Sequence, residues 1–320
     1  MCIRDSSLLG WIGVPGIRQR FVRPAFDVLV EHTEEGFRRP SPPPAPAASR
    51  QVLVLGDSYV WGWGVGQGEV FTDRLQSILG PDVAIHNRGV NAYSTAQQLL
   101  VLERESATGS FDEILVVFVP NDFDDNLDGK KGRRPGFALG KDGLVARNQP
   151  PARLMNPVAR LLKRSRALGW IDRGLTGLIA DHRGQAVPED WPPGNPWLGY
   201  HAASQEAVEL MAALLSRMAG VADSTGARLR IVILMESPNA GQLRMLCSQQ
   251  GLDCLDLAPQ MTASEAEESL YLDGDGHWTP PGHRRVANLL APHLRLPGKQ
   301  ESSGSSLSGA RPGSRSRPDR

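Results

Sequence analysis

The sequence predicts an α/β fold in which a doubly wound, five-stranded parallel sheet lies between two layers of helices. Two observations lead to this class. Five short apolar runs, bounded by turn residues, have the length and composition of buried strands. Longer segments with helical periodicity separate these runs, and strands that alternate with helices favour a parallel sheet covered on both faces. The expected architecture is a three-layer α/β/α sandwich.

The predicted strands and helices follow one another along the chain. Strands are expected at residues 51–55, 83–86, 113–119, 229–234 and 252–256. Helices are expected at residues 71–79, 95–105 after the potential cap Ser94, 203–221, 241–250, and 284–290 after Pro280 and Pro281. The common flavodoxin-like order of five such strands is 2-1-3-4-5, which brings the ends of the first three strands together.

Three segments flank or interrupt this alternation. Residues 1–49 are expected to form an N-terminal arm that ends in the Pro- and Ala-rich linker SPPPAPAAS at 41–49. Residues from about 127 to 198 break the pattern, and we expect an insertion there that lies over one end of the sheet. Residues 296–320 contain almost no apolar side chains and are expected to form a disordered tail. The predicted domain is therefore residues 50–295.

Charge and motifs exclude several classes of function. The 35 basic residues balance the 35 acidic ones, so the domain has no net charge with which to attract nucleic acid. Apolar runs all fall short of the roughly 18 residues of a membrane-spanning helix. The chain has no GxGxxG and no zinc-ligand spacing, and the acidic run at 121–126 reads as a solvated loop without the glycine of a calcium site. We expect no cofactor and no metal.

The three cysteines are too few for a disulfide scaffold. Cys247 and Cys254 lie seven residues apart, at the end of an expected helix and inside the next expected strand. This spacing permits a bridge in an oxidising compartment. The interpretation that we favour is a pair of buried, unbridged thiols.

Residues with catalytic chemistry follow the first three strands. Ser58 comes directly after the first strand, Gly89 after the second and Asn121 after the third. The ligand site of an open α/β sheet lies outside the carboxyl ends of its strands, so these residues are expected to be neighbours. A hydroxyl nucleophile with amide donors for an oxyanion is what acyl transfer requires. The alternative roles are a tight turn for Gly89 and an Asx turn for Asn121.

A serine nucleophile needs a base, and His277 is the candidate. It lies in a glycine-rich loop just before the last predicted helix. Asp275 and Asp273 are both close enough in sequence to hold one ring nitrogen and thereby fix the tautomer. The residues alone leave the choice between these two carboxylates open.

Together these residues resemble the four blocks of the SGNH/GDSL hydrolase family, over residues from about 50 to 292. GDSY at 56–59 carries Ser58, Gly89 matches the second block, Asn121 the third, and Asp275 with His277 the last. The resemblance implies the SGNH hydrolase fold and a serine esterase. In that scheme Ser58 attacks the ester, His277 is base and acid, and Asp275 orients His277. The amides of Ser58 and Gly89 and the Asn121 side chain hold the oxyanion.

Two positions depart from the family pattern. Pro120 precedes Asn121 where the family usually has Gly, and Gly274 stands three residues before His277 where it usually has Asp. The DxH arrangement is similar to that of the alginate-acetylation branch of the superfamily. The GDSYVWGWGV and GFRR segments also resemble a bacterial subgroup whose members are often exported or tethered. We therefore expect an exported or membrane-tethered extracytoplasmic protein. The opening MCIRDS resembles a leader found at the start of some assembled sequences, and on that ground we expect the native start to be missing.

Two other functions stay open on the same residues. A carbohydrate O-acyltransferase would use the same triad with a sugar hydroxyl in place of water, since both reactions pass through an acyl-enzyme. A catalytically degenerate carbohydrate-binding protein would fit the two departures. The expected partner is a small-molecule or carbohydrate ester and not nucleic acid, and the oligomeric state stays open. Trp61 and Trp63 are expected either to line the substrate pocket or to pack in the core.

Overall fold

The computed structural model describes residues 3–128, 134–141, 143–147, 195–262 and 269–294. Its centre is a five-stranded sheet in which every neighbouring pair of strands is parallel. The strands are β5 (Arg50–Leu55), β6 (Val83–Asn87), β7 (Glu113–Phe118), β10 (Arg228–Ile233) and β11 (Cys254–Asp256). Their spatial order is β11-β10-β7-β5-β6, which is the expected order 2-1-3-4-5 read from the other edge. The fold prediction is confirmed.

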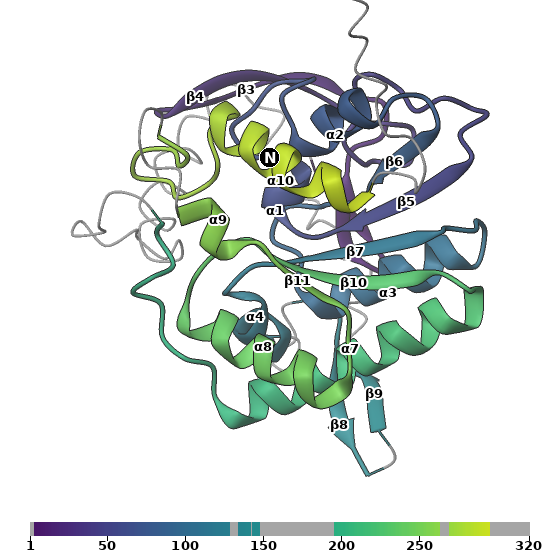
Figure 1. Ribbon diagram of the computed structural model, residues 1–320, viewed down its shortest axis with the longest axis vertical. Coiled ribbons are helices and arrows are strands. Elements are labelled where there is room, and N and C mark those ends of the chain that lie inside the picture. The colour runs from purple at the N-terminus through teal and green to yellow at the C-terminus, as the bar shows by residue number, and fades with distance from the viewer. Residues whose placement is uncertain (1–2, 129–133, 142, 148–194, 263–268, 295–320) are drawn as a thin grey trace, which may run out of the picture.

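Helices cover both faces of this sheet and make it the middle of three layers (Figure 1). One layer contains α3 (Thr95–Ser106), α7 (Gln205–Thr225) and α8 (Pro238–Gln250), and the other contains α2 (Phe71–Leu79) and α10 (Pro280–Leu294). The short helices are α1 (Ser58–Trp61), α4 (Asp122–Asp128) and α9 (Ala258–Thr262). Helix α8 begins three residues earlier than expected because Ser237 caps it and Pro238 occupies its first turn.

Each central strand divides its side chains between two hydrophobic cores. In β7, Ile114, Val116 and Phe118 pack in the core with α3, α7 and α8, while Leu115 and Val117 pack in the core with α2 and α10. This is the two-residue period of a strand with helices on both sides. It explains why these strands read as continuous apolar runs in the sequence.

The N-terminal segment folds into two antiparallel hairpins. They are formed by β1 (Ile3–Ser6) with β2 (Gly10–Gly13) and by β3 (Arg18–Arg23) with β4 (Phe26–Glu31). Leu9, Ile12 and Phe37 from this segment are buried in the α3 core. None of the four strands is expected from the sequence, because each has only four to six residues and its apolar residues are few or interrupted by polar ones; in β3, only Phe21 is buried.

Arg38 fastens this segment to the loop that follows α1. Its buried guanidinium donates to Gly62 O (3.2 Å), Val65 O (2.8 Å) and the Gln67 side chain, and it lies 5.0 Å from the ring centre of Trp61. Burial lowers the pKa of Arg38 to about 10, against the opposing effect of nearby carboxylates. These contacts fix the backbone of residues 62–67, which surrounds Trp63.

Part of the predicted insertion forms a third hairpin, β8 (Gly136–Gly140) with β9 (Gly143–Arg147). Phe137 and Ala138 are buried against the α4 and α7 side of the molecule. Residues 148–194 of the predicted insertion and the predicted tail at 296–320 lie outside the described residues. Within the described ranges, no helix is long and apolar enough to cross a membrane.

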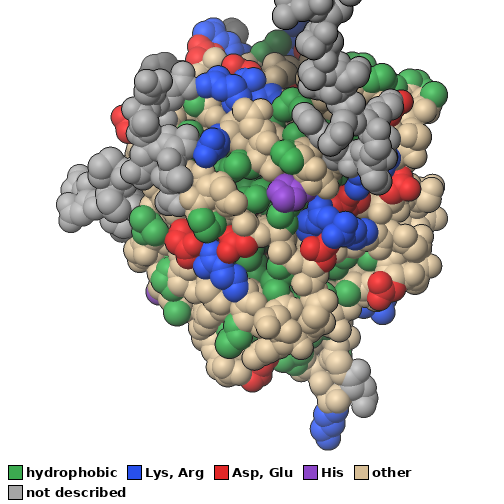
Figure 2. Space-filling model, in the orientation of Figure 1, with side chains coloured by type: hydrophobic (Ala, Val, Ile, Leu, Met, Phe, Trp, Pro, Cys, Tyr) green, Lys and Arg blue, Asp and Glu red, His purple; other side chains and the backbone are tan. Residues whose placement is uncertain are grey.

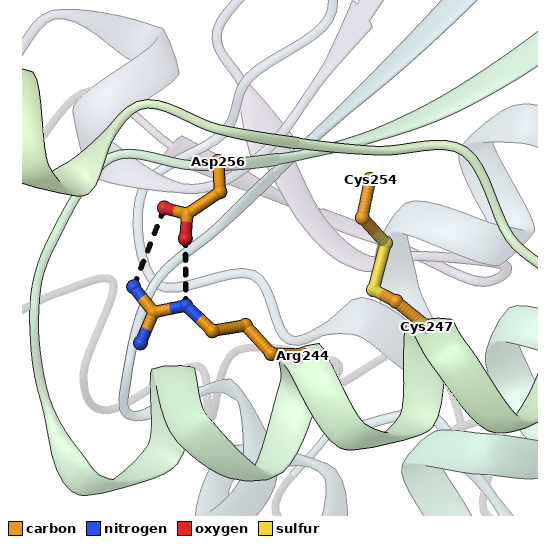
Figure 3. The surroundings of a disulfide bond; sticks show 4 residues. All are labelled: Arg244, Cys247, Cys254 and Asp256. Carbon is orange, nitrogen blue, oxygen red and sulfur yellow. Dashed lines mark hydrogen bonds and ion pairs between the residues drawn. A yellow bond between two sulfur atoms is a disulfide. The ribbon is translucent and has the colours of Figure 1, made fainter.

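The structure joins Cys247 to Cys254, so the favoured interpretation of two unbridged thiols is wrong (Figure 3). Helix α8 ends at Gln250 and is capped by Gly251, whose left-handed conformation turns the chain back toward β11. That reversal leaves the two Cα atoms 6.1 Å apart, within the span of a disulfide. Arg244, one turn earlier on α8, donates from Nε to Asp256 (2.7 Å), so two links tie this helix to the edge strand.

Charged groups are mixed on the surface and sparse inside. Figure 2 shows acidic and basic side chains interspersed on the face it presents, as the balanced composition suggests. Inside, Glu113 forms ion pairs with Arg50 and Arg230 at the amino end of the sheet. Arg50 also donates to the carbonyl of Leu294 (2.8 Å), which holds the end of α10 against this edge.

Two carboxyls, Asp57 and Asp122, are buried at the carboxyl end of the sheet. Burial raises the pKa of Asp57 to about 6. Burial, together with the charge of Asp57, also raises the pKa of Asp122 well above its usual range. Asp57 accepts a hydrogen bond from the Tyr59 amide (3.0 Å), and Asp122 accepts one from the Val119 amide (3.0 Å). Folding therefore favours the protonated forms and is opposed by their ionisation.

Asp57→Asn should raise the free energy of unfolding at pH 8 by about 3 kcal/mol, since the amide keeps an acceptor for Tyr59 and removes a buried charge. The raised pKa means that wild-type stability is complete below about pH 4 and declines as the pH rises to about 6. The gain should therefore vanish near pH 4. Urea unfolding across this range measures it, with the exposed Asp273→Asn as control; a gain that is independent of pH would contradict the burial argument.

Candidate active site

Strand β5 delivers Ser58 to the carboxyl edge of the sheet. The strand ends at Leu55, and Ser58 is the first residue of α1. Asp57 caps this short helix by accepting the Tyr59 amide, which fixes the turn between strand and helix. Ser58 is partly exposed, whereas the three residues that follow it are buried. The backbone that carries the serine hydroxyl is thus held in place by the hydrophobic core.

His277 lies in a closed loop, residues 270–279, just before α10. The loop is tied by hydrogen bonds from the Leu272 amide to the His277 carbonyl (2.7 Å) and from the Thr279 amide to the Leu270 carbonyl (3.0 Å). Gly274 and Gly276 take left-handed φ values of 62° and 78°, which side chains disfavour. These two glycines let the chain reverse tightly, so that the residues between and after them face the serine.

Ser58, His277 and Asp275 form one line of hydrogen bonds. Ser58 Oγ lies 2.7 Å from His277 Nε2, and His277 Nδ1 lies 2.5 Å from Asp275 Oδ1. The side chains of His277 and Asp275 are each 22% exposed, so solvent and a ligand can reach them. Asp273 is exposed at the rim of the loop. Of the two candidate carboxylates, the structure brings Asp275 to the imidazole.

Opposing effects set the charge of Asp275. Burial raises its pKa, but hydrogen bonds from His277 and from Trp63 Nε1 (3.1 Å) outweigh burial, so the pKa lies below its ordinary value. Asp275 is therefore ionised throughout the neutral range. An ionised carboxylate on Nδ1 fixes the tautomer in which Nε2 is free to accept a proton from Ser58.

Aromatic side chains surround the imidazole. The ring centres of Tyr59 and Trp63 lie 4.8 Å and 5.4 Å from that of His277, each inclined by 30° to it. The Tyr59 hydroxyl donates to the Gly276 carbonyl (2.7 Å) and accepts from Trp197 Nε1 (2.9 Å). Tyr59 therefore links α1 to the histidine loop and fixes the distance between serine and base.

Gly89 lies against the backbone of α1. A Cβ atom at this position would stand 2.5 Å from the amide nitrogen of Trp61, so any side chain would push α1 away. The Gly89 amide donates to the side chain of Asn87 (2.9 Å). The observed contacts show a position of close backbone packing, and the donor predicted for an oxyanion is engaged within the protein.

Asn121 stands at the start of α4. Its Nδ2 donates to Asp125 (2.8 Å), and its Oδ1 is buried with no partner among the described residues. The acidic run at 121–126 was expected to be a solvated loop, and this expectation is wrong because it forms most of α4. Asp122 is buried there, and Asp124 and Asp125 pair with His201 (2.9 Å) and Arg134 (3.2 Å).

Several residues at this edge escape sequence reasoning. Trp63, Trp197 and Ala92 have no motif of their own. Ala92, in the loop after β6, has a φ of 61°, the only positive value of a non-glycine residue in the described part of the chain. Arg134 donates to its carbonyl (2.9 Å). The closely spaced tryptophans after the serine were the one available signal, and the sequence left their role undecided.

No protein family model and no curated protein sequence matches this chain. Solved structures are similar at a distance. A member of the lipolytic protein G-D-S-L family from Veillonella parvula is 11% identical, with a TM-score of 0.44, over 77% of this chain and 98% of that one. The carbohydrate acetylesterase Est24 from Sinorhizobium meliloti is 12% identical, with a TM-score of 0.41, over the same shares. An inhibitor-bound aryl esterase from M. smegmatis is 13% identical, with a TM-score of 0.41, again over 77% and 98%. Similarities this weak carry no conclusion about activity, which has to be inferred from the site itself.

Proposed function

We propose that this protein is a serine esterase of the SGNH/GDSL type that hydrolyses short acyl or O-acetyl esters through an acyl-enzyme. The observation that carries the proposal is the line of hydrogen bonds from Ser58 through His277 to Asp275, with 2.7 Å and 2.5 Å between successive atoms. A hydroxyl, a base with a free nitrogen and an ionised carboxylate are the parts of a nucleophilic triad. Their position at the carboxyl edge of the sheet, where ligands bind in open α/β folds, supports it.

The proposed reaction has two halves. His277 Nε2 takes the proton of Ser58 as Oγ attacks the ester carbonyl, and the tetrahedral intermediate collapses when His277 returns that proton to the leaving alcohol. Water then attacks the acyl-enzyme with His277 again as base, and Ser58 is released with its proton restored. Asp275 stabilises the imidazolium at each step without taking the proton.

The oxyanion of the proposed intermediate needs hydrogen-bond donors beside Ser58. The backbone amide of Ser58 lies at the start of α1, where helical amides point outward. Gly89 donates to Asn87 and Asn121 donates to Asp125 in this structure, so either residue reaches an oxyanion only by exchanging that partner for the substrate.

The disulfide between Cys247 and Cys254 supports an extracytoplasmic location, since such bonds persist in oxidising compartments.

Ser58→Ala should lower the turnover of a short-chain ester such as p-nitrophenyl acetate by about 10³-fold or more, since covalent catalysis is lost. It should also abolish labelling by a fluorophosphonate. The thermal midpoint serves as the folding control. A folded variant with near-native turnover would overturn the assignment.

The rate of the wild-type enzyme should be independent of added metal ions, since every step of the proposed reaction uses only side chains of this chain. Chelators should leave the rate unchanged. Loss of activity with EDTA and recovery with zinc or calcium would instead indicate metal chemistry.

The two candidate acids should behave differently. Asp275→Asn keeps the shape but favours the wrong tautomer, and should lower turnover by up to about 10⁴-fold. Asp273→Asn, at the exposed rim, should change turnover by less than about tenfold. The measurements are the turnover and the thermal midpoint of both variants. Equal small effects on turnover would mean that neither carboxylate orients His277 and that the site is a Ser-His dyad.

A further inference from the structure

Trp63 makes two contacts with the pair His277–Asp275. Its Nε1–H donates to Asp275 Oδ2 (3.1 Å), while the other carboxylate oxygen faces His277 Nδ1 (2.5 Å). Its ring also stacks on the imidazole, with ring centres 5.4 Å apart. Because each carboxylate oxygen has its own partner, the carboxylate cannot rotate toward solvent without breaking one of these hydrogen bonds.

The N-terminal hairpin β3–β4 holds Trp63 in turn. Phe21 and Phe26 present their edges to it, with ring centres 5.0 Å and 5.8 Å away and planes at 83° and 80°. The guanidinium of Arg23 lies 5.9 Å from the ring centre of Trp63 and 4.8 Å from that of Phe21. These residues belong to an aromatic cluster distinct from the two sheet cores. Trp63 therefore connects the hairpin to the acid–base pair.

Trp61 provides an internal comparison. It lies in the same cluster, its ring centre is 6.3 Å from that of Phe21, and the Arg38 guanidinium lies over its ring. None of the contacts found among the described residues joins Trp61 to Asp275 or His277. The two tryptophans thus share a hydrophobic setting and differ in the hydrogen bond to the carboxylate.

We propose that Trp63 is a positioning residue, which holds the Asp275 carboxylate in line with His277, and that the β3–β4 hairpin acts on catalysis through it. This inference rests on the proposed esterase function. It gives the N-terminal segment a role in the reaction in addition to its packing. The hydrogen bond from Nε1 is the essential part, because the edge contacts with Phe21 and Phe26 require only an aromatic ring.

Trp63→Phe keeps an aromatic ring and removes the donor. We expect kcat on p-nitrophenyl acetate to fall by about 10- to 100-fold, as for the loss of a hydrogen bond to a charged group, with KM changed less than about threefold. The matched control Trp61→Phe puts a smaller ring into the same cluster and should change kcat by less than about threefold. Equal losses of kcat in the two variants, accompanied by equal falls in thermal midpoint, would overturn the proposal in favour of a packing role.

A double-mutant cycle tests whether Trp63 acts through Asp275. In the Asp275→Asn background, Trp63→Phe should lower kcat by less than about threefold, because its target is already lost. Independent, multiplicative effects would overturn the proposal. Both single variants and the double variant are compared at the same pH by the rate of fluorophosphonate labelling as well as by turnover.

Proton NMR gives a readout that does not need activity. The proton shared by His277 Nδ1 and Asp275 should give a strongly deshielded resonance that moves in Trp63→Phe and stays in place in Trp61→Phe. An unchanged resonance in Trp63→Phe would overturn the positioning role. If wild-type protein is neither active nor labelled, the proposed function fails, and the resonance alone then decides whether Trp63 positions the carboxylate.

Discussion

The hydrogen bond between Ser58 Oγ and His277 Nε2 joins residues 219 positions apart, and much of the structure serves to let it form. Its 2.7 Å length leaves little tolerance in either partner. The serine is fixed because β5 lies inside the sheet and α1 is capped at once by Asp57. The histidine is fixed because its loop is hydrogen-bonded at both ends and Tyr59 holds the Gly276 carbonyl.

Close backbone packing holds the segments that carry Ser58 and His277 in place. Gly89 brings the loop after β6 against α1, and Gly282 brings the start of α10 against the Leu270 carbonyl, 2.3 Å from where a Cβ would stand. A side chain at Gly89 would displace the serine, and one at Gly282 would displace the histidine loop. Close backbone packing therefore adjoins both of the segments that carry Ser58 and His277.

The sheet and the site residues on it could be predicted from the sequence, because buried parallel strands read as apolar runs and their carboxyl ends meet by topology. Ser58, Asp275 and His277 come together as the motif spacing suggests. The N-terminal hairpins could not be predicted, since their strands are short, lack a long apolar run and depend on packing against the domain. Helix α4 could not be predicted either, because the partners of its acidic residues, Arg134 and His201, lie outside the acidic run.

The proposed nucleophile and base lie near opposite ends of the domain's sequence, and this arrangement has a consequence for biosynthesis. A growing chain that has been translated as far as β10 already contains Ser58 and its capping Asp57, but it does not yet contain His277. By contrast, Arg38, the residues that it binds and the aromatic cluster lie almost wholly in the first quarter of the chain. Most of these residues are therefore synthesised early. The proposed centre is thus complete only once the final loop has joined the sheet, and a fragment that stops before residue 277 lacks the proposed base.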